Sequence, residues 1–142
     1  WSFATNQVAG VTIQLDNKST QFVRLPNSTW RSADNKALDQ IQSAMLEETL
    51  YRMGVLSAVG WVAEGEPAME ITGIKPAANQ LTAEVDTSDG PRQFRLEFGN
   101  KGPLGRTRVM TEQYGTPTIF SAPNEFTNVY QATLQILGLA KP

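Results

Sequence analysis

The chain of 142 residues is 40% apolar and 18% charged, with a formal net charge of −2 at pH 7. This length fits one domain with its own core, and this composition is typical neither of a disordered chain nor of a strongly basic nucleic-acid-binding protein. The sequence has no cysteine and no histidine, which excludes disulfides, thiolate metal sites, cysteine nucleophiles, a Ser-His-Asp triad and an ordinary zinc site.

The first predicted element is a β-hairpin. Residues 11–15 alternate apolar and polar, and residues 20–25 form a second β-rich run beyond the turn-forming residues 16–19. Residues 29–31 follow as a short extended piece. We expect this piece to place Trp30 in the core rather than in a ligand site.

The segment 34–54 is the only long stretch with a clear helical period. Its apolar residues recur at three- and four-residue spacing and predict one buried stripe of Leu38, Ile41, Met45 or Leu46, Leu50 and Met53. Ser32 and Asp34 offer side-chain oxygens to the first backbone amides, and Gly54 is expected to end the helix in the left-handed conformation. We therefore predict an amphipathic helix that lies on a sheet.

The remaining segments are predicted mainly as strands. A strand is expected within residues 55–64, residues 69–74 are ambiguous, and residues 81–85 and 93–98 form a hairpin around the turn Asp89-Gly90. Residues 99–105 read as a loop, 106–111 and 116–121 as strands, and 124–138 as a helix that ends at Gly138. The predicted fold is a single α+β domain, residues 1–142, with a twisted, mainly antiparallel sheet of about six to eight strands covered by the central and C-terminal helices.

This order of elements resembles a known family. The resemblance is carried by Trp30 with Asp34 four residues later, by Thr72-Gly73-Ile74-Lys75-Pro76, by the hairpin at 81–100 and by TPTIFSAPNEF at 116–126. Together they are similar to a domain family of unknown function found in membrane-anchored bacterial proteins encoded beside gliding-type ABC transporters. The resemblance implies an extracytoplasmic α+β domain behind an N-terminal transmembrane helix. It implies no established enzymatic activity and supplies no catalytic residue.

The sequence itself contains no segment that could provide this anchor. No apolar run approaches the ~20 residues that span a bilayer, and no signal-peptide pattern opens the chain. Because the chain begins at Trp1, we expect a processed protein or an excised domain, whose missing N-terminal segment could have carried the anchor. Contact with a membrane is expected only through such a segment.

The densest basic region is a possible contact surface and consists of Arg92, Arg95, Lys101, Arg106 and Arg108. A basic stripe on a sheet can bind phosphate backbones or acidic partners. However, the polar face of a one-sided sheet has the same composition, and the chain as a whole is slightly acidic. We therefore interpret this region as a solvated or protein-contacting face, and nucleic acid is not an expected partner.

Other motifs suggest chemistry only weakly. The run 99–107, GNKGPLGRT, lacks the spacing of a P-loop. We interpret Glu64, Glu66 and Glu70 as an acidic surface loop rather than a glycosidase pair. Residues 86–90 are interpreted as a hairpin turn rather than a calcium loop. The aromatic residues could include an exposed patch for a sugar or a partner, drawn from Trp1, Trp61, Tyr51, Tyr114 and Tyr130. No catalytic residue, cofactor site or metal site is predicted.

Three hypotheses for function follow. The preferred one is a non-catalytic extracytoplasmic domain of the cell envelope that acts through protein contacts, as an accessory part of an ABC-type transport or surface machinery. The second is a binding module for a glycan or a small ligand. The third is a hydrolase that uses carboxylates or a serine-lysine pair, although no particular serine stands out. No cofactor is expected, and the sequence does not identify the protein partner.

Overall fold

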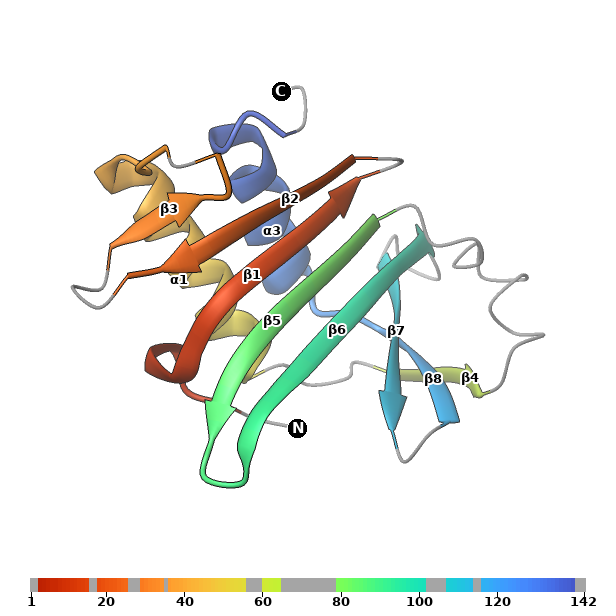
Figure 1. Ribbon diagram of the computed structural model, residues 1–142. Coiled ribbons are helices and arrows are strands. Elements are labelled where there is room, and N and C mark those ends of the chain that lie inside the picture. Colours follow the sequence, from red (N-terminus) through yellow and green to blue (C-terminus); the bar gives the residue numbers. More distant parts are fainter. Residues whose placement is uncertain are drawn as a thin grey trace.

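The computed structural model describes residues 3–15, 18–25, 29–34, 36–55, 60–64, 79–101, 107–113 and 116–139 (Figure 1). Within these ranges the chain forms an eight-stranded sheet, two α-helices and a short 3-10 turn, η1 (Thr5–Gln7). Every strand pair is antiparallel. The predicted α+β fold, with its mainly antiparallel sheet and its central and C-terminal helices, is therefore confirmed.

The strand order of the sheet is β3-β2-β1-β5-β6-β7-β8-β4. Both predicted hairpins are present: β1 (Val8–Leu15) with β2 (Lys18–Arg24), and β5 (Asn79–Thr87) with β6 (Gly90–Lys101). The strands predicted at 106–111 and 116–121 are β7 (Thr107–Gln113) and β8 (Thr116–Ser121), which pair with each other. The short strands β3 (Trp30–Ser32) and β4 (Gly60–Glu64) complete the order at its two ends. Strand β5 returns to the middle of the sheet and pairs with β1.

One predicted loop boundary is wrong. Residues 99–101 belong to β6, whereas the sequence placed them in a loop because of the glycines there. Lys101 pairs with Thr107 of β7 after a register shift that begins at Phe98. The neighbouring strand therefore keeps this glycine-containing segment extended, with a bulge where the register changes.

Helix α1 (Gln40–Gly54) begins six residues later than predicted. Its N-cap is Asp39, whose carboxylate accepts a hydrogen bond from the backbone N–H of Gln42 at 2.7 Å, while the Gln42 side chain accepts one from the backbone N–H of Asp39 at 3.0 Å. The predicted caps Ser32 and Asp34 bond to each other instead.

The late start of α1 has a non-local cause. The backbone N–H of Leu38 donates to the carbonyl of Trp30, and Ala37 forms a β-bridge with Arg31. Backbone groups that are paired with a strand cannot take part in the first helical turn. The residues before Asp39 are therefore extended, and the Ser32–Asp34 contact stabilises the turn that precedes them.

Gly54 is the last residue of α1, but it does not take the left-handed conformation that was predicted. The residues with a left-handed glycine conformation in the described ranges are Gly90 and Gly138, so Gly54 is not one of them. A Cβ at Gly54 would overlap the carbonyl oxygen of Phe3, whose backbone N–H donates to the Gly54 carbonyl at 3.2 Å. The glycine is needed for the close approach of another segment.

The buried stripe of α1 consists of Leu46, Leu50 and Met53, and the prediction that Ile41 belongs to it is wrong. The Ile41 side chain is 66% exposed. With 3.6 residues per turn, Ile41 lies about 140° from Leu46 around the helix axis. Leu38, which precedes the helix, packs against the core as a partly buried residue.

Helix α3 (Asn124–Ile136) matches its prediction closely. Gly138 has a φ of +75°, and the N–H groups of Gly138 and Leu139 donate to the carbonyls of Gln135 and Leu134 at 3.1 and 2.8 Å. This pair of hydrogen bonds is a Schellman motif, and it satisfies backbone carbonyls that the helix end would otherwise leave unpaired.

The core lies between the sheet and the two helices, which cover the same side of the sheet (Figure 1). The side chains at the centre of this layer are Ile13, Trp30, Leu50, Leu81, Leu96, Phe126 and Tyr130. The rings of Phe98 and Tyr130 stack with centroids 4.7 Å apart. No helix of the described ranges covers the opposite side of the sheet.

Candidate interaction surfaces

A polar cluster joins α1 to the edge of the sheet. Arg24 of β2 contacts the carboxylate of Glu47 on α1 at 2.9 Å and donates to the backbone carbonyl of Thr5 at 3.0 Å. The indole N–H of Trp30 donates to the same Glu47 oxygen at 2.8 Å, and the guanidinium lies 4.8 Å from the Trp30 ring centroid. Because these groups bind one another, the cluster holds the helix in place rather than forming a substrate site.

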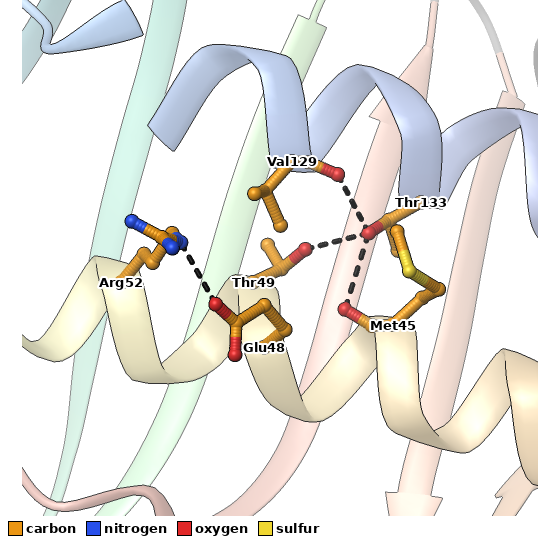
Figure 2. A network of polar contacts seen from close by, with 6 residues as sticks. All are labelled: Met45, Glu48, Thr49, Arg52, Val129 and Thr133. Atoms are coloured by element: carbon orange, nitrogen blue, oxygen red, sulfur yellow. Dashed lines mark hydrogen bonds and ion pairs between the residues drawn. The ribbon is translucent and has the colours of Figure 1, made fainter. Parts of the chain in front are cut away.

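A buried hydroxyl pair joins α1 to α3 (Figure 2). The Thr49 and Thr133 hydroxyl oxygens are 2.7 Å apart, and Thr133 Oγ1 lies 2.8 Å from the Val129 carbonyl and 3.1 Å from the Met45 carbonyl. Thr133 has one hydroxyl proton, which it donates toward these carbonyls, so Thr49 is the donor to Thr133. The pair therefore fixes the two helices relative to each other.

The predicted basic residues do not form one surface in the part that the structure describes. Arg92 and Arg95 are both exposed on β6, where they pair with Val85 and Thr82 of β5. Residues three apart on a strand point to opposite sides of the sheet. Arg92 also pairs with Asp89 at 3.9 Å. The remaining three, Lys101, Arg106 and Arg108, have side chains outside the described part.

The predicted hairpin turn is confirmed. Gly90 has a φ of +106°, and the Thr87 hydroxyl donates to the Gly90 carbonyl at 2.6 Å and accepts from the Asp89 N–H at 3.3 Å. Among the described residues, no three acidic side chains gather in a way that could hold a metal ion. The side chains of Glu64, Glu66 and Glu70 are not part of what the structure describes.

The aromatic residues that were considered as a patch differ in their surroundings. Tyr51 is 55% exposed on α1. Tyr130 is buried, donates to the Asn79 side chain at 2.9 Å, and has a raised pKa because of its burial. These two residues therefore do not share a surface, and Trp1, Trp61 and Tyr114 have side chains outside the described part.

The side of the sheet away from the helices is polar. Its central residues follow the alternation of the strands, opposite the buried positions Val11, Leu81 and Leu96. Two neighbouring cross-strand rows lie there: Gln21, Thr12, Thr82 and Arg95 in one, and Ser19, Gln14, Gln80 and Glu97 in the other. This sheet face carries amide, hydroxyl and charged groups of both signs.

The side of α1 away from the core carries exposed apolar residues, and the C-cap residue Val55, which follows the helix, adds another. Ile41, Tyr51 and Val55 are 66%, 55% and 55% exposed. They belong to a row with alternating three- and four-residue spacing, which we call the outer stripe: Ile41, Ala44, Glu48, Tyr51 and Val55. Glu48 is bonded to Arg52 at 2.9 Å (Figure 2). On a 3.6-residue period this row lies roughly opposite Leu46, Leu50 and Met53.

Helix α3, which packs beside α1, is also poor in charge. Its exposed residues include Asn128, Gln131, Gln135 and Ile136, and Glu125 is the only charged residue in the helix. The Gln42 side chain donates to the Ile136 carbonyl at 3.4 Å, which places the end of α3 beside the start of α1. Ile136 itself is 42% exposed.

The sequence prediction missed the outer stripe, although a signal for it was present. Positions 41, 44, 48, 51 and 55 have the spacing of a second helical seam. Ile41 was predicted in the buried stripe, whereas it belongs to this second row. Two apolar rows on opposite sides of one helix also leave little net amphipathicity to detect.

Comparisons with known proteins give no relative. A scan against protein families, a search of curated proteins and a search of solved structures each found no match. Among the described helices, none has both the length and the apolar character needed to cross a membrane.

Proposed function

We propose that this chain is a non-catalytic extracytoplasmic domain that acts through protein contacts, as an accessory part of an ABC-type transport or surface machinery. The observation that carries the proposal is the outer stripe of α1, where Ile41, Tyr51 and Val55 are each more than half exposed. The cores of protein interfaces are depleted in charged residues and enriched in aromatic ones. A row of this composition on the outside of a helix is suited to contact with another protein.

The contacts that fix α1 in the fold also support a role of the outer stripe in binding. The Arg24–Glu47–Trp30 cluster attaches the helix to the sheet, and the Thr49–Thr133 hydroxyl pair attaches it to α3. A surface on a fixed element loses little conformational freedom when a partner binds. The outer stripe is therefore presented in one arrangement.

The cell-envelope location and the link to a transporter rest on the resemblance in sequence. The segments that carry it and lie in the described part are Trp30 with Asp34, the β5–β6 hairpin and the approach from β8 to α3. Their order resembles that of the family. In the proposed role, the domain is held outside the cytoplasmic membrane and meets its protein partner through α1.

Site-specific photo-crosslinking in the cells that encode the protein tests this role. A benzophenone amino acid replaces Tyr51 in the full-length protein, and a matched variant carries it at the exposed Gln21 on the opposite side of the sheet. We expect protein adducts from position 51 and far fewer from position 21. Adducts at position 21 alone, or none at position 51, would contradict a contact through α1.

The location has its own test. Protease added to spheroplasts should digest the full-length protein, while a cytoplasmic marker in the same cells stays intact. Protection of the protein until the cells are lysed would contradict an extracytoplasmic domain, whatever the crosslinking result.

A further inference from the structure

The outer stripe is nearly symmetric in its spacing about Glu48 and complementary in its side-chain sizes. Glu48 lies at its middle, Ile41 and Val55 lie seven residues away on either side, and Ala44 and Tyr51 lie four before and three after. If two copies of α1 run antiparallel about a two-fold axis at Glu48, Ile41 of one copy meets Val55 of the other. The small Ala44 then meets the large Tyr51, so large and small side chains interdigitate.

We infer that the partner of the outer stripe is the outer stripe of a second copy of this chain, packed antiparallel about a two-fold axis. This inference rests on the proposed function, because it names the partner of the same surface. An isologous interface requires a patch that is complementary to itself. Every apolar member of the stripe meets an apolar member in this alignment.

The charges of α1 also complement themselves. Glu48 at the middle of the stripe and Arg52 at its edge are an acid and a base four residues apart, 2.9 Å from each other within one helix. At the two-fold axis, two such pairs come together, and each Arg52 lies about one helical turn from Glu48 of the other copy. The result is a cluster of two acids and two bases with no net charge, which limits the cost of bringing the Glu48 side chains together.

The chemistry of the surface argues against a lipid membrane as the occupant. Helices that lie on membranes carry several lysines or arginines beside their apolar row. Arg52 is the only basic residue of α1, and it is bonded to Glu48. The amide side chains Gln131 and Gln135 are exposed on α3, the helix that packs beside α1, and amide side chains suit the polar rim of a protein interface.

The size of the surface sets the strength of the dimer. Helix α1 has 15 residues, which corresponds to a length of about 22 Å. A pair of such helices buries less than the ~1,200 Å² of a stable specific interface. We therefore expect a weak dimer that forms as the protein concentration rises from the micromolar to the millimolar range. The fraction of dimer would increase further where an anchor concentrates the chains.

Cysteine crosslinking tests the arrangement directly, because the chain has no cysteine of its own. Ile41→Cys and Val55→Cys are prepared separately, and each is treated with a short bis-maleimide alone and as a mixture. The antiparallel alignment predicts strong crosslinking in the mixture and little in either variant alone. Crosslinking of Ile41→Cys to itself would show a parallel pair and overturn the alignment, and Gln21→Cys provides the background level.

Sedimentation velocity over the same concentration range tests the dimer itself. Tyr51→Glu should weaken self-association at least roughly tenfold, whereas Gln21→Glu on the opposite side of the sheet should leave it unchanged. Thermal unfolding of both variants should match that of the original chain, since both positions are exposed. A chain that stays monomeric at millimolar concentration would overturn the inference.

The two levels of the proposal can fail separately. If the chain is monomeric but position 51 crosslinks to a different protein in cells, the inference of self-association is wrong and the proposed function stands. If adducts form only from position 21, the proposed contact through α1 is wrong and the inference falls with it.

Discussion

Both sides of α1 carry a row of apolar residues, but only one of the two rows is buried. Leu46, Leu50 and Met53 are fully buried against the sheet, whereas Ile41, Tyr51 and Val55 lie more than half exposed on the other side. Each burial of a large apolar side chain contributes roughly 1.5–3 kcal/mol, and the sheet can cover only one side of a helix. The difference teaches that apolar spacing identifies a contact surface, while the pairing of neighbouring segments decides which surface faces the core.

The two sides of α1 should differ most in their tolerance of a charge, and a charge on the buried side should have the largest effect on stability. Leu50→Asp should unfold the domain, because an unpaired buried carboxylate costs several kcal/mol against a total stability of about 5–15 kcal/mol. Glu48→Ala on the outer stripe should barely change the midpoint of thermal unfolding followed by circular dichroism. Similar midpoints for the two variants would mean that the buried side has been assigned wrongly.

Alkaline pH should weaken the α3 part of the same buried layer. Burial raises the pKa of Tyr130 above its ordinary value of 10.0, so the folded state holds this proton more tightly than the unfolded chain. The contribution of Tyr130 is thus fully present below pH 10 and declines as the pH rises above it. Denaturant titrations at several pH values should show a shallower alkaline loss in Tyr130→Phe, and equal slopes for the two proteins would refute the assignment.

Substitution of the Thr49–Thr133 hydroxyl pair tests how α1 and α3 are fixed to each other. Thr133→Val removes the acceptor of the buried Thr49 hydroxyl and should cost about 1–3 kcal/mol in the free energy of unfolding. Because the two threonines share one interaction, the double variant Thr49→Val/Thr133→Val should lose less than the sum of the single variants. Additive losses in a double-mutant cycle would show that the hydroxyls do not interact.

The helix start offers a smaller and sharper comparison. Asp39→Ala removes the N-cap side chain and should cost about 1 kcal/mol, whereas Asp34→Ala should leave the helix content unchanged because Asp34 bonds to Ser32 instead. Urea titrations together with far-ultraviolet circular dichroism measure both. A larger loss in Asp34→Ala would support the originally predicted cap.

The smallest effect is expected on the outer stripe itself. Ile41→Lys should change the free energy of unfolding by no more than about 0.5 kcal/mol, as is typical of exposed positions, while Leu46→Ala should cost about 2–5 kcal/mol. Urea titrations of both variants give the comparison. A destabilisation by Ile41→Lys as large as that of Leu46→Ala would place Ile41 in the core.

Local patterns were sufficient for the β5–β6 turn and for the end of α3. The β5–β6 hairpin follows from alternating residues on both sides of Asp89-Gly90, and Gly90 has the positive φ that such a turn needs. Gly138 likewise takes the left-handed conformation that ends α3. In these places the residues that determine the structure are neighbours in the sequence.

The features that escaped prediction depend on distant segments. Strand β3 pairs with residues 37–38 and delays the start of α1, and the carbonyl of Phe3 makes Gly54 necessary at its end. The helical period alone places Ile41 about 140° from Leu46, but only the packing against the sheet shows that the side with Leu46 is the buried one. The proposed contact surface was missed for the same reason, because only packing shows which apolar residues remain outside.

The placement of β5 beside β1 affects how the chain acquires its structure during synthesis. Val8 pairs with Val85, so the second neighbour of β1 leaves the ribosome only after all of α1 has been made. Sheets that depend on such distant pairings form slowly, and their incomplete forms expose apolar surface. The nascent chain therefore passes through a stage in which both apolar rows of α1 are uncovered, and a chaperone that binds apolar segments would find its target there.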